Sequence, residues 1–511
     1  MTLLVLILVL LLTLYCFGKR ELGYWTQRGV KHDLPIPFLG NNARGFLLLR
    51  SVSQICEDVY WKYPNEKIVG FYRGSSPELV VRDPALARRI LINDFASFYP
   101  RGLLSTQPVI EPLLRNLFFA DGDSWRLLRQ RLTPAFTGGK LRGMFPLIVD
   151  RAEHLQTRTL ELAAAGRAID ARDLMARYTT DFIGACGFGL DTDSLENKES
   201  AFRKLGSKIS NVGFVALVVN VLKIMFPYTF RNFKVAGEVE KDIRKIVDEV
   251  QRHRNYKPSG RGDFIDLLLE CKEKGTIVGE SIERVTADGR PEVATLEMDD
   301  DLVIAQVFIF FAAGFETSSS ATSITLNELA HNPDIQTRVQ AEVDRVLTRH
   351  GKLTYDAVKE MTYLEWALKE GLRIFPPVGF LVRECVRPYT IDGVAIDPGI
   401  KVLISLQAMH NDPQYFDEPD QFRPERFDSQ QFASNHAYMP FGAGPRACIG
   451  ERLGLMQSLA GLAAILSRFT VHPAPSASRR PKVDPTSPLV QNVVGVPLVF
   501  VERNGVMSSI I

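Results

Sequence analysis

The chain has 511 residues, of which 46% are hydrophobic and 23% charged, and a formal net charge of +2. This composition excludes an intrinsically disordered chain, and the near-neutral charge gives no general attraction to nucleic acid. The six cysteines are scattered without CxxC pairs, so neither a disulfide framework nor a structural zinc site is predicted.

The N-terminal segment differs from the rest of the chain. Residues 2–17 carry no charge and are followed at once by Lys19 and Arg20. This predicts a transmembrane signal anchor over 1–20 with the following domain in the cytosol. A cleaved secretory signal is the alternative, but no basic segment precedes the apolar run and no small-residue cleavage site follows it. A basic, proline-containing linker over 21–40 then leads into one large domain over 41–511.

We predict that this domain is mainly α with small β-sheets. Residues 67–91 alternate apolar and polar around a turn and then become helical, which indicates a β-hairpin and a helix. Helical periodicity dominates from about 120 to 350, with breaks that include a polar stretch at 272–297. Short strand-like runs return past 375, and the chain ends in a strand pair near 487–501.

One predicted helix begins after the acidic residues 299–301 and ends at Pro333. Its centre is apolar on every side, so we expect it to be buried. Within it, the stretch AAGFETSSS places Glu316 beside Thr317. A carboxylate in so apolar a helix is costly unless it has a role.

The stretch PFGAGPRACIG places Cys448 among three glycines, just before a second long helix. A thiol at a helix N-terminus is expected to have a lowered pKa, which favours the thiolate. The glycines allow a flat ligand to approach the backbone, and Arg446 can meet an anionic group of that ligand. The alternative is a core cysteine in a glycine-rich turn.

The pattern F-x-x-G-x-R-x-C-x-G, carried by Phe441, Gly444, Arg446, Cys448 and Gly450, resembles the haem-binding loop of cytochromes P450. The resemblance implies the P450 fold, a single large haem domain. It also implies that Cys448 is the axial thiolate ligand of the iron of haem b, a ligand that favours cleavage of the O–O bond.

Two further sets of residues match this family. Glu370 and Arg373 lie three apart on one helix face, and with Arg426 of FRPERF they resemble the family's buried structural triad.

Trp125 and Arg129, one helical turn apart, match the family's partners of one haem propionate, and Arg383 matches the partner of the other. His410 is a weaker candidate for the same role.

Ala313, Glu316 and Thr317 match the family's oxygen-activation motif. The resemblance implies that small residues such as Ala313 leave room beside the iron, that Thr317 hydrogen-bonds the bound oxygen, and that Glu316 supplies protons through water. The alternative is a hydroxyl bonded back onto its own helix.

The resemblance implies a monooxygenase that inserts one oxygen atom from O2 into a lipophilic small molecule. The stretches YWTQRGV and FYPRG look like those of insect microsomal P450s of the detoxifying kind, which implies xenobiotics such as plant toxins or insecticides and a place on the cytosolic face of the endoplasmic reticulum. Three alternatives remain: an enzyme for an endogenous lipid or hormone, an isomerase or dehydratase that does not activate oxygen, and a non-enzymatic haem sensor or carrier.

Electrons must come from outside, because the chain has no glycine-rich dinucleotide fingerprint. The family uses NADPH–cytochrome P450 reductase, which carries FAD and FMN, and cytochrome b5 is a second candidate partner. A local basic patch for an acidic partner is expected from Arg126, Arg131, Lys140 and Arg452.

The segments that correspond to the family's substrate pocket are mostly apolar, which predicts a lipophilic substrate. They are 103–117, Phe308, Phe311, Ala312, Val378, Phe380, Leu381 and 490–494.

Overall fold

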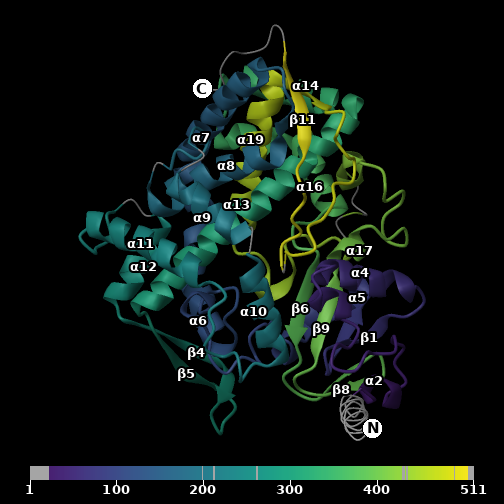
Figure 1. The fold of residues 1–511 in the computed structure, drawn as a ribbon. Helices are drawn as coiled ribbons and strands as arrows, with labels where there is room; N and C mark the ends of the chain where they lie inside the picture. Colours follow the sequence, from purple (N-terminus) through teal and green to yellow (C-terminus); the bar gives the residue numbers. More distant parts are fainter. Residues whose placement is uncertain are drawn as a thin grey trace, which may run out of the picture.

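Helix α13 (Asp300–His331) runs through the middle of the helical part of the molecule (Figure 1). It begins as predicted, because the side chain of Asp299 caps it by accepting a hydrogen bond from the N–H of Leu302 at 2.6 Å. Its faces pack against α8 (Ala171–Ile183), α16 (Thr362–Ile374) and α19 (Glu451–Arg468). It is the one described helix long and apolar enough to cross a membrane, but most of that apolar stretch is buried inside the protein. It is therefore a core helix.

The structure is a computed structural model and describes residues 22–190, 192–197, 200–210, 213–260, 263–428, 432, 435–487 and 489–503. The predicted anchor over 1–20 lies outside the described residues.

Helices make up most of the described chain and fill the upper and left parts of Figure 1, which confirms a mainly α protein with small sheets. Besides the four helices already named, the described α-helices are α2 (Tyr24–Gln27), α3 (Ala43–Phe46), α4 (Val52–Lys62), α5 (Pro84–Arg88), α6 (Gly122–Leu132), α7 (Gly138–Ala164), α9 (Ala201–Ser210), α10 (Phe214–Met225), α11 (Gly237–His253), α12 (Phe264–Glu273), α14 (Pro333–His350), α15 (Tyr355–Glu360) and α17 (Leu406–His410).

The largest sheet has four strands in the order β1-β2-β9-β6 and lies with α4 and α5 in the lower right of Figure 1. The strands β1 and β2 form the predicted hairpin. The pair β2 and β9 is parallel, and the other two pairs are antiparallel. The bounds are β1 (Ile68–Arg73), β2 (Ser76–Val81), β6 (Phe380–Glu384) and β9 (Lys401–Ser405).

The remaining strands form one three-stranded sheet, β10-β11-β3, and two hairpins. The last strand lies close to its predicted position, but it pairs with the strand that directly follows α19 and with β3 rather than with a neighbour near 487. The bounds are β3 (Ile169–Asp170), β7 (Tyr389–Ile391), β8 (Val394–Ile396), β10 (Phe469–Pro473) and β11 (Pro497–Glu502).

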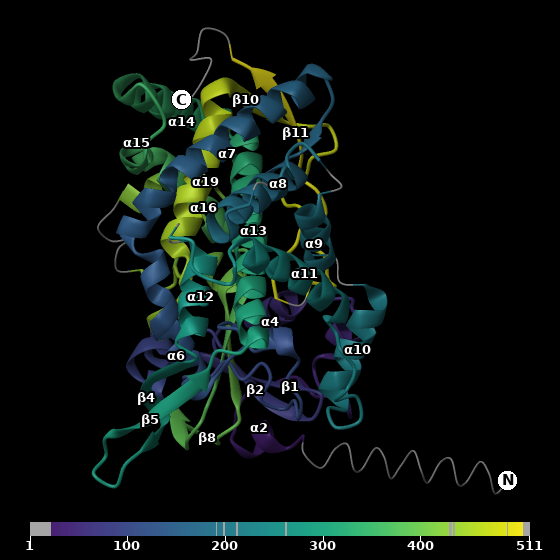
Figure 2. The ribbon, with the colours of Figure 1, turned by 90° about the vertical axis from the view of Figure 1, so that its left-hand side faces the viewer.

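The polar stretch at 272–297, predicted only as a break, contains a long hairpin of β4 (Thr276–Val285) and β5 (Pro291–Glu297). Figure 2 shows that it projects from the lower end of the molecule beside α6. It packs against α6 with few buried side chains, since its outward-facing positions are polar or exposed valines. For this reason the sequence contains no apolar run that predicts the hairpin.

Candidate functional site

The loop that carries Cys448 is closed by backbone hydrogen bonds. The N–H of Cys448 donates to the carbonyl oxygen of Phe441 at 2.8 Å, and that of Ala447 donates to Gly444 at 2.9 Å. Gly444 has a positive φ of 73°, and a Cβ there would lie 2.0 Å from the carbonyl oxygen of Leu91. The neighbouring backbone therefore requires a glycine at this position.

The thiol of Cys448 lies at the start of α19, as predicted, but its pKa is raised rather than lowered. Burial is the largest influence and raises the pKa, while the N–H of Gly450 and the charge of Arg129 lower it less. Cys448 is nevertheless exposed to solvent, as is Ala313 in the otherwise buried α13. A thiolate at this position therefore needs a further cation.

Four buried or half-buried arginines gather around this loop: Arg101, Arg129, Arg383 and Arg446. Burial and then the like charges of Arg101 and Arg446 hold the pKa of Arg383 well below its usual range. Burial lowers the pKa of Arg446 to about 9, and that of Arg101 to about 10. So many cations in a poorly solvated space favour an anion among them.

Asp121 is the carboxylate within this cluster. It accepts a hydrogen bond from Nη2 of Arg446 at 2.7 Å and from the backbone N–H of Arg101 at 2.8 Å. The guanidinium of Arg446 also lies over the ring of Trp125, 4.3 Å from its centroid. Arg446 is thereby held in one orientation.

The strand β6 presents its residues alternately to two sides. Arg383 belongs to the arginine cluster, and Leu381 lies beside Gly442 of the Cys448 loop. Phe380 instead packs into the core between the large sheet and α4. Successive strand residues point to opposite faces, so Phe380 and Leu381 lie on different sides of β6. Their predicted place in the substrate pocket stays a prediction.

The substrate-pocket residues predicted on α13 also differ in their burial. Phe311 is fully buried against the rings of Phe188, Phe202 and Phe315, as a core residue is. Phe308 and Ala312 are only partly buried. Their predicted place in the substrate pocket stays a prediction.

The hydroxyl of Thr317 donates to the carbonyl oxygen of Ala313 at 2.7 Å, which is the back-bonded arrangement left open as an alternative. Its oxygen retains acceptor capacity for a second hydrogen bond.

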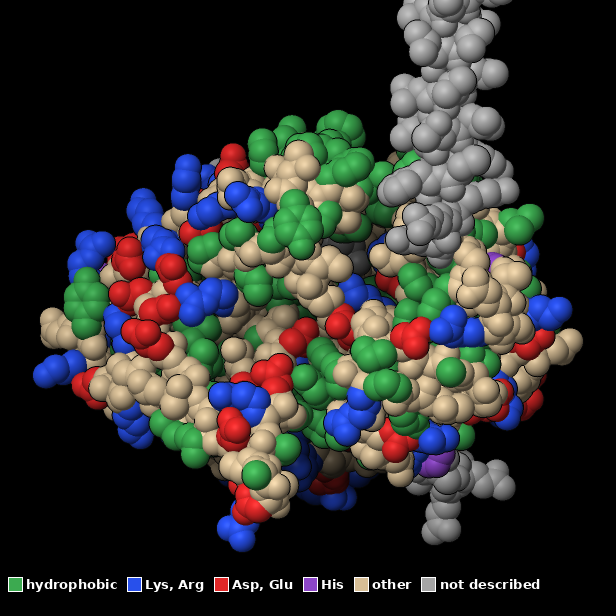
Figure 3. All heavy atoms as spheres, turned by 90° about the horizontal axis from the view of Figure 1, so that it is seen from below, with side chains coloured by type: hydrophobic (Ala, Val, Ile, Leu, Met, Phe, Trp, Pro, Cys, Tyr) green, Lys and Arg blue, Asp and Glu red, His purple; other side chains and the backbone are tan. Residues whose placement is uncertain are grey.

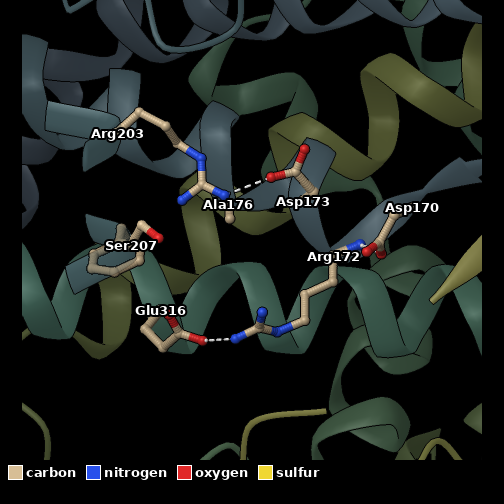
Figure 4. Close-up of a pocket in the computed structure, with 8 residues that line it drawn as sticks. Asp170, Arg172, Asp173, Ala176, Arg203, Ser207 and Glu316 are labelled. Carbon is tan, nitrogen blue, oxygen red and sulfur yellow. Dashed lines mark hydrogen bonds and ion pairs between the residues drawn. The ribbon is translucent and has the colours of Figure 1, made fainter. Parts of the chain in front are cut away.

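Glu316 points away from Thr317, toward α8. Its Oε1 lies 2.5 Å from Nη2 of Arg172. The pair borders a polar hollow of about 300 Å³ whose other charged walls include Asp173 and Arg203, as Figure 4 shows. Glu316 thus connects α13 to this polar hollow on the side of α8 and α9.

The predicted triad forms. Arg373 makes a two-bond ion pair with Glu370, at 2.8 and 2.9 Å, and Nε of Arg426 lies 3.0 Å from the same carboxylate. Glu370 and Arg373 are fully buried. Arg373 also donates to the carbonyl oxygen of His410 at 2.9 Å, so the triad ties α16 to α17 and the segment around 426.

His410, the weaker candidate for a propionate partner, is fully buried. Its Nε2 accepts a hydrogen bond from the backbone N–H of Met439 at 3.1 Å, and its ring stacks on Tyr438. Burial and the charge of Arg373 lower its pKa to about 3. It is therefore a neutral support beneath the Cys448 loop and not a cation of the arginine cluster.

Comparison with known proteins decides the family. The family model "Cytochrome P450" matches residues 32–496. Cytochrome P450 6B6 of Helicoverpa armigera is 36% identical over 97% of both chains. Cytochrome P450 6a2 of Drosophila melanogaster is 37% identical over 93% of this chain and 95% of its own, and cytochrome P450 6k1 of Blattella germanica is 32% identical over 99% and 98%.

The chain belongs to the cytochrome P450 family. Its members are oxidoreductases that carry haem with a cysteine thiolate, so this P450 is a monooxygenase with an external redox partner and a lipophilic substrate.

The residues of this P450 fit a haem. Within the described chain, Nε of Arg383 and both Nε and Nη1 of Arg446 are buried without a hydrogen-bond partner. Haem propionates are carboxylates that accept such bonds. A haem has two propionates, which need buried hydrogen-bond donors, and an iron, which needs a thiolate ligand. The unpaired arginine N–H groups and the accessible thiol of Cys448 meet these two needs.

The sequence did not identify Arg101 and Asp121 as parts of the P450 site. Arg101 lies in the FYPRG stretch, whose likeness to insect microsomal P450s assigns no role to this arginine. Nothing in the local pattern distinguishes it from a surface arginine. The nearby signal was the pair of Pro100 and Gly102 around it, which marks a turn.

Proposed function

We propose that Cys448 holds the iron of haem b and that Arg129, Arg383 and Arg446, with Arg101 and Trp125, receive its propionates. The main observation that supports this proposal is that the accessible thiol of Cys448 lies beside buried arginines with unpaired N–H groups. When bound, the haem supplies oxygen activation, and the protein supplies orientation, protons and exclusion of bulk water. The remaining loop residues Phe441, Gly444 and Gly450 hold the loop in shape.

Thr317 is proposed to position the oxygen ligand by accepting or donating a hydrogen bond near Ala313. Glu316 is proposed to take up protons from the polar hollow shared with Arg172 and to pass them on through water after reorientation. The ion pair with Arg172 supports this role, because it turns the carboxylate of Glu316 toward the polar hollow.

The proposed substrates are lipophilic xenobiotics such as plant toxins or insecticides. The apolar, partly exposed side chains of Phe308, Ala312 and Leu381, together with Val378, support a lipophilic ligand near the Cys448 loop. The similarity to insect P450s supports the detoxifying class.

We propose attachment to the cytosolic face of the endoplasmic reticulum through the anchor at 1–20, followed by the linker and the haem domain. In support, exposed apolar side chains gather on one face of the domain (Figure 3), and those on and after α10 include Phe214, Val215, Phe226 and Tyr228. A surface of this kind suits the boundary of a bilayer.

The proposed electron donor is NADPH–cytochrome P450 reductase, with cytochrome b5 as an accessory donor. The exposed cations Lys140 and Arg452, with Arg126 and Arg131 on α6, offer a docking surface for an acidic protein.

The decisive experiment compares the wild type with Cys448→Ala. The wild-type ferrous carbonyl complex should show the red-shifted Soret band of thiolate ligation and, with reductase, NADPH and O2, should oxidise a lipophilic probe. The variant should lose both. A retained band would exclude Cys448 as the ligand, and product formed without NADPH would favour an isomerase or dehydratase.

A further inference from the structure

The carboxylate of Asp123 in the first turn of α6 holds the β4–β5 hairpin against this helix. Asp123 accepts hydrogen bonds from the hydroxyl of Ser281 at 2.8 Å and from the backbone N–H of Ile282 at 2.7 Å. Burial raises the pKa of Asp123, but the hydrogen bonds from Ser281 and Ile282 outweigh it and the pKa is lowered. The carboxylate is therefore a charged anchor for the hairpin.

Two glycines let the hairpin approach α6 closely. A Cβ on Gly122 would lie 2.2 Å from the carboxylate of Glu283, and a Cβ on Gly279 would lie 2.7 Å from the side chain of Leu127. Each Cβ would displace the end of the neighbouring side chain, that of Glu283 or of Leu127. The hairpin is thus a fitted part of this face of the molecule and not a loosely attached loop.

The two elements have opposite charge. Residues 276–297 carry five acidic and two basic side chains, whereas α6 carries three arginines and one aspartate. Of these arginines, Arg129 serves the Cys448 loop and Arg126 faces the hairpin, with its Nη2 3.0 Å from Oε2 of Glu280. The hairpin therefore presents to α6 the kind of charge that an acidic partner would present.

The ion pair between Arg126 and Glu280 is weak enough for another carboxylate to take the place of Glu280. The side chain of Glu280 is 67% exposed and that of Arg126 is 29% exposed, unlike the half-buried anchor at Asp123. Exposed ion pairs contribute little and are weakened by salt. Lys140 and Arg452 are exposed too, and neither has an ion pair within the described part of the chain.

We propose that the acidic β4–β5 hairpin competes with the electron donor for its docking surface, and we call the hairpin a guard in this sense. The carboxylate of Glu280 occupies Arg126, and an acidic partner must displace it to dock, whereas Lys140 and Arg452 stay available for the first encounter. This inference rests on the proposed docking of an acidic reductase at α6.

The test is Glu280→Gln, which removes the competing charge and leaves the anchor at Asp123 intact. With turnover measured against reductase concentration at low ionic strength, the variant should reach half-maximal rate at a reductase concentration about two- to fivefold lower than the wild type. The difference should disappear at high salt.

The matched control is Glu297→Gln, which makes the same charge change on an exposed position at the base of the same hairpin. Arg126→Gln should weaken reductase binding, and adding Glu280→Gln to it should have no further effect. Equal amounts of the carbonyl complex in all variants will show that the haem site is unchanged.

An unchanged reductase dependence in Glu280→Gln, or the same gain in Glu297→Gln, would overturn the guard while leaving the monooxygenase proposal intact. Absence of reductase-supported turnover in the wild type would remove the proposed donor and the guard together.

Discussion

Arg129 and Ala447 are joined by a hydrogen bond of 2.8 Å from Nη1 of the arginine to the carbonyl oxygen of the residue that precedes Cys448. This bond connects α6 to the loop across the arginine cluster. The guanidinium therefore supports the backbone of the loop as well as offering its remaining donors to a propionate.

Arg129→Ala should lower haem retention by about tenfold or more, since hydrogen bonds to charged groups contribute about 1.5–3 kcal/mol. Haem content per protein after dialysis against a haem acceptor measures this. Gln130→Ala, on the exposed side of the same helix, should retain haem like the wild type. Full retention by Arg129→Ala would contradict the proposed role.

Thr317→Ala should release more hydrogen peroxide per NADPH consumed, because the hydroxyl that orients the oxygen ligand is gone. We expect product per NADPH to fall by about tenfold or more. Thr317→Ser keeps the hydroxyl and serves as the control. If Thr317→Ala remains as well coupled as Thr317→Ser, the hydroxyl is only a brace on its own helix.

Glu370→Gln should cost about 3–5 kcal/mol of unfolding free energy, because Arg373 and Arg426 lose the carboxylate that compensates their buried charge. Denaturant unfolding at neutral pH measures the loss. Glu365→Gln, which breaks the half-exposed pair with Lys369 on the same helix, should cost less than about 1 kcal/mol. Equal losses in the two variants would show that burial of the triad is not decisive.

Stability should fall on the acid side because of His410. Its pKa of about 3 in the folded protein lies below the usual 6.5, mainly through burial. The unfolded chain therefore binds a proton first as the pH falls. The contribution is complete above pH 6.5 and is lost progressively between 6.5 and 3. The loss amounts to about 2 kcal/mol at pH 5.

Unfolding free energies at pH 7.5 and pH 5 measure this loss. His410→Gln should reduce the difference between the two values, while the exposed His253→Gln should leave it unchanged. A pH dependence identical in His410→Gln and the wild type would mean that other groups cause the acid loss.

The sequence by itself determined the features whose physics is local. Caps and apolar periodicity located α13, alternation located β1 and β2, and fixed spacings brought together the Cys448 loop and the pair Glu370 and Arg373. Helical geometry places residues three apart on one face whatever the rest of the fold does. For that reason these predictions needed no tertiary information.

The tertiary structure alone decided which distant residues meet. Arg101 and Asp121 lie in the site because the turn before α6 lies against the Cys448 loop. Phe380 lies on the other side of β6 from Arg383 because successive strand residues point to opposite faces. The raised pKa of the Cys448 thiol also depends on packing, since desolvation by the surrounding protein outweighs the nearby N–H groups of its own helix. Burial is a property of the assembled chain, and no local pattern carries it.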